Sequence, residues 1–172
     1  MINISLPTDT LKNLSLDNSD GTDKYMVESK IMALDFDLIK RKYANTFNCS
    51  EEYAKSVDSI LENDNCKLFI EFKNGIIDAK QKKAINLKAK DSLLIYGDIK
   101  GETLEYFRNN FTFILVYNGN KNKAHYNKIQ NNIAKNAKLS LVRFGLETLK
   151  GVFFKEVFTY DQNEFEKFLE TL

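Results

Sequence analysis

The sequence predicts an α/β domain in which a mixed central sheet is flanked by helices. Two apolar segments, Cys66–Lys73 and Phe111–Tyr117, have the length and composition of buried strands. Between them, apolar residues recur near helical spacing from Ala79 to Tyr96 and predict a helix. Because a helical connection of this length lets two strands run parallel, we expect the helices to pack in layers on the sheet.

The amino-terminal part is expected to be an arm followed by two helices. Residues 1–22 are polar and lack periodicity, so we assign them to an arm ahead of a single domain over residues 23–172. Apolar residues at helical spacing predict a first helix within residues 23–34. A second helical run is expected to start at Asp35 and to continue through Tyr43.

The remaining elements are a hairpin before the central strands and a strand–helix unit at the end. Val57–Glu62 has the pattern of a short strand, which the turn Asn63–Asn65 joins to the next strand. Lys150–Tyr160 is expected to be a strand. The Asp161 and Glu164 pair that follows has the spacing of a capping box, which predicts a last helix.

The composition is that of a globular domain rather than a disordered or secreted chain. The chain has 172 residues, of which 43% are hydrophobic, so it can bury a substantial core. Its 25 basic and 24 acidic residues nearly cancel, so affinity for nucleic acid would need local clustering of charge. Two cysteines and one histidine disfavour a zinc enzyme or a Ser-His-Asp hydrolase. Since neither a signal peptide nor a membrane-length apolar run is visible, we expect a cytoplasmic protein.

Three charged residues on the predicted hairpin are the candidate site. On a strand, side chains two positions apart share a face, so Glu71 and Lys73 project together, away from Ile70 and Phe72. If the strand that carries Asp58 pairs antiparallel with theirs, Asp58 lies opposite Ile70 or, with a small shift, opposite Glu71. Two carboxylates so close repel each other, so we predict a metal ion, or Lys73, between them. The alternative is a cross-strand ion pair on a solvated sheet face.

The order of elements resembles the core of the PD-(D/E)XK, or restriction-endonuclease-like, superfamily. The resemblance lies in the sequence helix, strand with Asp58, strand with Glu71-x-Lys73, helix and strand. It covers residues 23–117 and leaves residues 118–172 as an extension. The chain departs from the pattern at Val57, where the motif has proline. It also lacks an evident strand between Lys40 and Lys55. The segments KSVDSIL, LFIEFKNG, DSLLIYGDIK and FTFILVYN are in addition similar to a group of uncharacterised bacterial proteins.

This resemblance implies a metal-dependent nuclease. Asp58, Glu71 and the backbone carbonyl of Phe72 would bind Mg²⁺ or Mn²⁺, and Lys73 would orient or help deprotonate the attacking water. Separately, cations and N–H groups at the start of the following helix favour phosphate, which makes three residues candidates for binding it: Gln81, Lys82 and Lys83.

A second function fits the same fold. A protein of this class that has lost catalysis would act by binding a partner, as an immunity or antitoxin-like protein binds a toxin, and would need no cofactor. The near-neutral charge of the chain motivates this alternative. Expected partners are therefore nucleic acid, DNA in preference to RNA, or a protein such as a toxin. We expect no membrane partner and keep a homodimer as one alternative.

Overall fold

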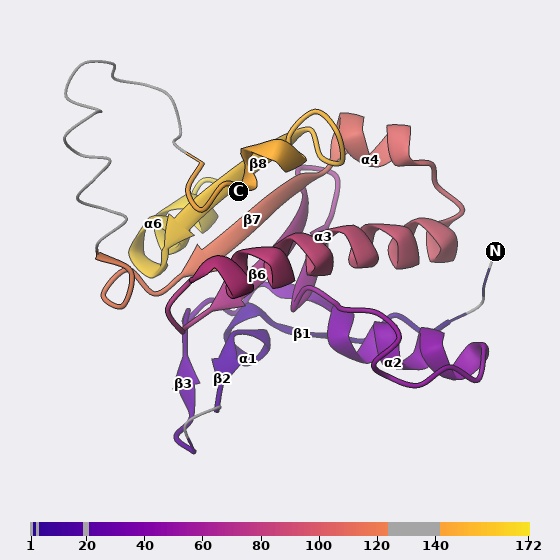
Figure 1. The fold of residues 1–172 in the computed structure, drawn as a ribbon, viewed down its shortest axis with the longest axis horizontal. Helices are drawn as coiled ribbons and strands as arrows, with labels where there is room; N and C mark the ends of the chain where they lie inside the picture. The colour runs from indigo at the N-terminus through magenta and orange to yellow at the C-terminus, as the bar shows by residue number, and fades with distance from the viewer. Residues whose placement is uncertain (1, 3, 19–20, 124–141) are drawn as a thin grey trace.

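The computed structural model describes residues 2, 4–18, 21–123 and 142–172 (Figure 1). Its strands are β1 (Thr8–Thr10), β2 (Leu16–Asp17), β3 (Lys24–Tyr25), β4 (Met32–Asp35), β5 (Ser59–Glu62), β6 (Lys67–Lys73), β7 (Thr112–Tyr117) and β8 (Glu156–Asp161). Its helices are α1 (Leu11–Leu14), α2 (Phe36–Thr46), α3 (Ala79–Lys100), α4 (Leu104–Asn110), the 3₁₀ helix η1 (Leu146–Leu149) and α6 (Gln162–Leu169).

The described strands form a mixed sheet in the order β1-β4-β5-β6-β7-β8, with β2 and β3 paired separately. From β1 to β6 neighbouring strands are antiparallel, whereas β6, β7 and β8 are parallel. The long helix α3 makes the crossover between β6 and β7 and lies across one face of the sheet (Figure 1). These findings confirm the predicted class, a mixed sheet flanked by helices with a carboxy-terminal strand–helix unit.

Helix ends follow local capping chemistry. The Asp35 side chain accepts the Leu38 N–H at the start of α2, and Asp78 does the same for Gln81 in α3. At the far end of α3, Gly101 adopts a left-handed conformation with φ of 70°, which ends the helix with little strain because glycine lacks a Cβ. The capping box expected at the start of the last helix is present in α6.

The helix predicted within residues 23–34 is wrong. That segment contains β3 and β4, and β4 pairs with β1 on one side and with β5 on the other. The apolar run of β4 spans only a few residues, and so short a run has no decisive period, so its conformation is set by the neighbouring strands. The helix predicted from Asp35 is confirmed as α2.

The amino-terminal arm also needs correction. Within residues 1–22, β1 joins the main sheet and α1 buries Leu11 completely. The N–H groups of Leu11 and Lys12 donate to the carbonyls of Ile31 and Ser29, so this segment is tied to the domain. At the other end, the last strand begins at Glu156 rather than Lys150, because η1 and the turn that follows it precede β8.

Each face of the sheet has its own hydrophobic core. Phe69 of β6 packs with Phe36 of α2 and Tyr96 of α3 on one face. Its neighbours Ile70 and Phe72 face the other core, which includes Phe165 of α6. Since alternate residues of β6 enter opposite cores, Glu71 projects to the same side as Phe69, toward α3.

Candidate functional site

Glu71 is a buried acid at the contact between β6 and α3. Its side chain is 2% exposed. The ammonium group of Lys88, from α3, lies 2.7 Å from Glu71 Oε1 and 2.9 Å from Oε2. Glu71 therefore lies on the face of the sheet opposite to Ile70 and Phe72, as strand alternation predicts, and its partner is Lys88 of α3 rather than a residue of its own strand.

Asp58 immediately precedes β5 and shares that lysine. Its Oδ1 is 3.6 Å from Lys88 Nζ, and its Oδ2 accepts the Phe72 N–H at 2.5 Å. The ladder pairs Ser59 with Ile70, so the register continues with Asp58 opposite Glu71, the shifted one of the two predicted arrangements. The two carboxylates thus converge where β5 begins and β6 ends.

Helix α3 also holds the chain that leads into Asp58. The Lys55 N–H donates to Asp91 and the Val57 N–H donates to Ser92, each at 2.8 Å. Both acceptors are on α3, within four residues of Lys88, and Ser92 is fully buried. One helix therefore positions both the lysine of the cluster and the backbone that carries Asp58.

The cluster is electrostatically unfavourable without a cation. Burial raises the pKa of Glu71 well above its usual range, the charge of Asp58 raises it further, and Lys88 opposes both effects. Burial also raises the pKa of Asp58, which Lys88 and the Phe72 N–H oppose. Burial lowers the pKa of Lys88, but the two carboxylates outweigh it and the net shift is upward. Lys88 thus favours the charged forms of Asp58 and Glu71, and the two carboxylates favour the charged form of Lys88.

The lysine that lies between the two carboxylates is not Lys73, the lysine predicted from the sequence. Lys88 takes that position, whereas Lys73 makes no ion pair with Asp58 or Glu71 in the part of the chain that the structure describes. Lys73 instead lines an adjacent pocket, together with Asp58. Lys88 belongs to α3, so the spacing of residues along β6 gave no indication of it.

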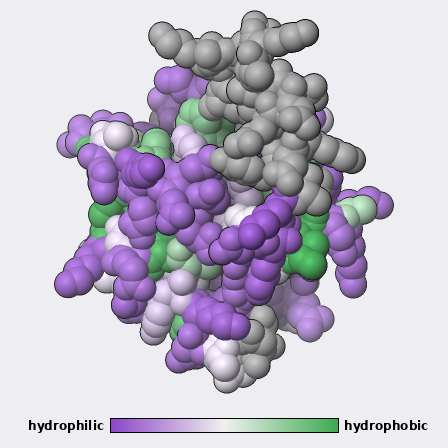
Figure 2. Space-filling model, turned by 90° about the vertical axis from the view of Figure 1, so that its left-hand side faces the viewer, coloured by the Kyte–Doolittle hydropathy of each residue, from purple (hydrophilic) through white to green (hydrophobic). Residues whose placement is uncertain are grey.

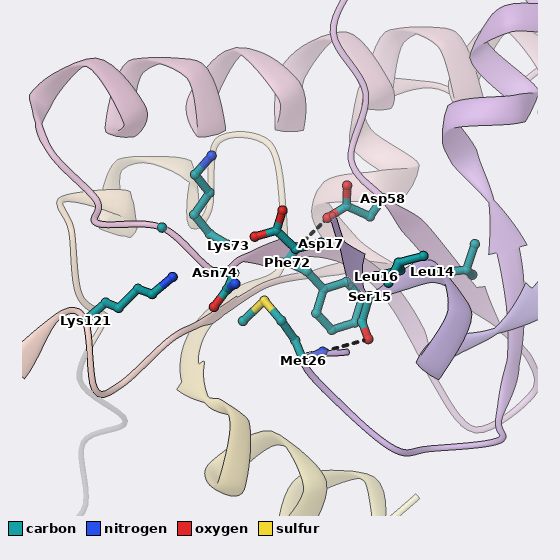
Figure 3. A pocket seen from close by; sticks show the side chains of 11 residues that line it. Leu14, Ser15, Leu16, Asp17, Met26, Asp58, Phe72, Lys73, Asn74 and Lys121 are labelled. Carbon is teal, nitrogen blue, oxygen red and sulfur yellow. Dashed lines mark hydrogen bonds between the residues drawn. The ribbon is translucent and has the colours of Figure 1, made fainter. Parts of the chain in front are cut away.

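The adjacent pocket has a volume of about 330 Å³ and a mixed lining. Figure 3 shows Asp58 on one side of it, Lys73 and Lys121 toward the other, and the Asp17 carboxylate between them in this view. The complete lining comprises Leu14, Ser15, Leu16, Asp17, Met26, Asp58, Phe72, Lys73, Asn74, Gly75 and Lys121. The pocket thus combines two amines, two carboxylates and an apolar wall, which suits a polar ligand larger than an ion.

The surface nearby is also polar. Figure 2 shows the side of the molecule that carries the start of α3 and the loop after β7, and hydrophilic residues cover most of what is coloured there. Asn74, which is buried, accepts a hydrogen bond from the Asn118 side chain at 2.7 Å, and this contact joins the ends of β6 and β7.

The residues predicted to bind phosphate are in a different place. Gln81, Lys82 and Lys83 form the first turns of α3, where Asp78 already accepts the Gln81 N–H. Lys82 and Lys83 line a second pocket of about 600 Å³ with Asn86, Leu87, Lys90, Phe144 and Gly145. None of these residues lines the pocket beside Asp58.

A signal for Lys88 was present in the sequence. The buried residues of α3 recur at intervals of three and four, and Lys88 and Ser92 fall in that series: Ile85, Lys88, Ala89, Ser92, Leu93 and Tyr96. A charged or polar residue on the buried stripe of a helix needs a partner in the protein interior. Lys88 pairs with Glu71, and Ser92 accepts the N–H of Val57, the residue before Asp58.

The carboxylates of Asp58 and Glu71 are the oxygen ligands that the cluster brings together for a metal. Among the described residues no group of three or more His, Cys, Asp or Glu is arranged to hold one. Carboxylate and carbonyl oxygens are nevertheless the donors that Mg²⁺ and Mn²⁺ prefer, and Mg²⁺ commonly uses only one or two carboxylates. The donor set of Asp58 and Glu71 fits such an ion chemically.

Comparison with protein-family models, with curated proteins and with solved structures gave no match for this chain. In the described residues no helix is both long and apolar enough to cross a membrane. The fold and the site therefore define a class: an α/β protein with a carboxylate–lysine cluster where two antiparallel strands meet the crossover helix.

Proposed function

We propose that this protein is a metal-dependent nuclease of the PD-(D/E)XK type, acting on DNA in preference to RNA. The observation that carries the proposal is the convergence of the Asp58 and Glu71 carboxylates on one cation, the ammonium of Lys88. Two acids that share a cation at the ends of adjacent strands are suited to hold a divalent ion beside a phosphate.

The arrangement of strands supports this proposal. β4, β5 and β6 form an antiparallel series, and α3 then leads into the parallel strand β7. The strand expected between Lys40 and Lys55 is absent; β4 at Met32–Asp35 pairs with β5 instead, and it precedes α2 in the sequence. β4 was overlooked because residues 23–34 were predicted to form a helix.

The residues of the chain have distinct roles in this proposal. Asp58, Glu71 and the Phe72 carbonyl would hold Mg²⁺ or Mn²⁺. The bound ion would neutralise charge on the phosphate and make its water more acidic. Lys73 and Lys121 present amines to the pocket beside Asp58, where they would attract and orient the phosphate backbone.

Metal titration and cleavage assays on the same variants test the proposal. We expect wild-type protein to bind Mn²⁺ in calorimetry and to cleave plasmid or single-stranded DNA, and Glu71→Gln and Asp58→Asn to lose both properties. Glu62→Gln is a matched control, because Glu62 is also a partly buried acid paired with lysines but lies at the opposite end of β5. Intact DNA and RNA together with no Mn²⁺ binding would contradict the proposal.

One observation favours the alternative of a non-catalytic interaction protein. Lys88 already contacts both oxygens of Glu71, so the charge of this acid is balanced within the chain itself. A protein that only binds a partner such as a toxin could keep this cluster as a buried ion pair. Absence of Mn²⁺ binding in both wild type and a variant without the Lys88 ammonium would favour this function.

A further inference from the structure

Lys88 occupies the position that a shared metal ion would take. Its ammonium touches both oxygens of Glu71 and lies 3.6 Å from Asp58 Oδ1. Mg²⁺ binds carboxylate oxygens at about 2.0–2.1 Å, so an ion held by both acids would stand almost in contact with this ammonium. Two cations cannot share that space, because their repulsion in a partly buried site is strong.

The lysine, rather than the acids, is free to move. Glu71 is on a central strand and its side chain is 2% exposed, whereas the Lys88 side chain is 28% exposed. A lysine ends in four flexible methylene groups, so its ammonium can leave while its backbone stays in α3. Asp58 is held by the Phe72 N–H, and the backbone before it is held by Asp91 and Ser92.

We infer that Lys88 is a built-in counter-cation that a divalent metal must displace, and that it thereby sets the metal affinity of the site. This inference rests on the proposed function and adds its regulation. Without metal, the lysine offsets part of the charge of the two carboxylates and occupies the space between them. With metal, the lysine is released and the acids bind the ion.

The consequence is a competition that can be measured without any activity assay. Lys88→Met removes the competing charge but keeps a side chain of similar length. It should bind Mn²⁺ about tenfold more tightly than wild type or better, a change that corresponds to a modest electrostatic interaction. Mn²⁺ should also raise the Tm of Lys88→Met by more than it raises the Tm of wild type, because tighter binding to the folded state stabilises it more.

The experiment is Mn²⁺ calorimetry and thermal unfolding of wild type, Lys88→Met and Lys80→Met. Lys80 is an exposed lysine in the first turn of the same helix, so it controls for the loss of one positive charge. We expect its Mn²⁺ affinity to match wild type. An affinity of Lys88→Met equal to or weaker than wild type would overturn the inference while leaving the metal site intact. No Mn²⁺ binding by any of the three proteins would instead refute the proposed function, and the inference with it.

A measurement on wild type decides the matter if Lys88→Met does not fold. Lysine acetylation followed by mass spectrometry reports how accessible each ammonium is. We expect Lys88 to react slowly without metal and at least about threefold faster with saturating Mn²⁺, whereas Lys80 reacts equally in both conditions. A reactivity of Lys88 that Mn²⁺ leaves unchanged or lowers would overturn displacement.

Discussion

Lys88 donates a hydrogen bond to Glu71 Oε2 at 2.9 Å, and its ammonium lies 2.7 Å from Oε1 in an ion pair, across the contact between α3 and β6. Residues 17 positions apart are thereby joined at the centre of the fold. Since Asp58 reaches the same ammonium, one helix side chain connects the crossover helix to two strands.

Replacing Lys88 should destabilise the protein far more than replacing Lys73. Lys88→Met leaves the buried Glu71 and the partly buried Asp58 without their cation, and removing one partner of such a pair costs about 3 kcal/mol in the free energy of unfolding. Lys73→Met should change that free energy by less than about 0.5 kcal/mol, since it breaks no ion pair in the described residues. Urea denaturation without metal measures both, and equal losses would contradict the assignment of Lys88 as the partner of the acids.

Ile70 and Ile76 provide a matched pair for testing the core. Ile70 is fully buried in β6, so Ile70→Ala should lower the free energy of unfolding by about 2–5 kcal/mol. Ile76 is 68% exposed after the same strand, and Ile76→Ala should stay within about 0.5 kcal/mol of wild type. Chemical denaturation is again the measurement. A small effect at Ile70 would show that β6 is not central.

Ser92 should be needed for the stability of the segment before Asp58. Ser92→Ala removes the side-chain oxygen that accepts the buried Val57 N–H, and an unsatisfied buried donor costs about 1–3 kcal/mol. Ser50→Ala, at an exposed serine in a turn, is the control and should be nearly neutral. Faster amide hydrogen exchange at Val57 in Ser92→Ala would locate the effect, and unchanged exchange would argue against it.

Glu62 should make the stability of the protein sensitive to acid. Burial raises its pKa, but hydrogen bonding from Tyr96 and the charges of Lys100 and Lys67 outweigh burial, so the net pKa is below its ordinary value of 4.5. A carboxyl with a lowered pKa in the folded state stabilises above its unfolded pKa, and this contribution is lost as the pH falls through the folded value. The Tm difference between wild type and Glu62→Gln should therefore shrink from about pH 6 to about pH 3. A difference that is constant with pH would contradict this role.

The sequence was sufficient to predict the elements that have a long, regular apolar pattern. The apolar runs of β6 and β7 and the periodicity of α3 predicted these elements and their parallel arrangement. It was insufficient for β4, because a four-residue strand takes its conformation from β1 and β5 rather than from its own period.

For the candidate site, the sequence by itself determined that Glu71 and Lys73 share a face of β6 and that Asp58 lies near them, because strand alternation and hairpin register are short-range properties. Only the tertiary structure decided which cation stands between the acids. The packing of α3 on the sheet brings Lys88 to Glu71 and leaves Lys73 at the neighbouring pocket. The reason is physical: an ion pair forms between groups that packing places together, and the position of a helix on a sheet is set by the whole core rather than by residue spacing along one strand.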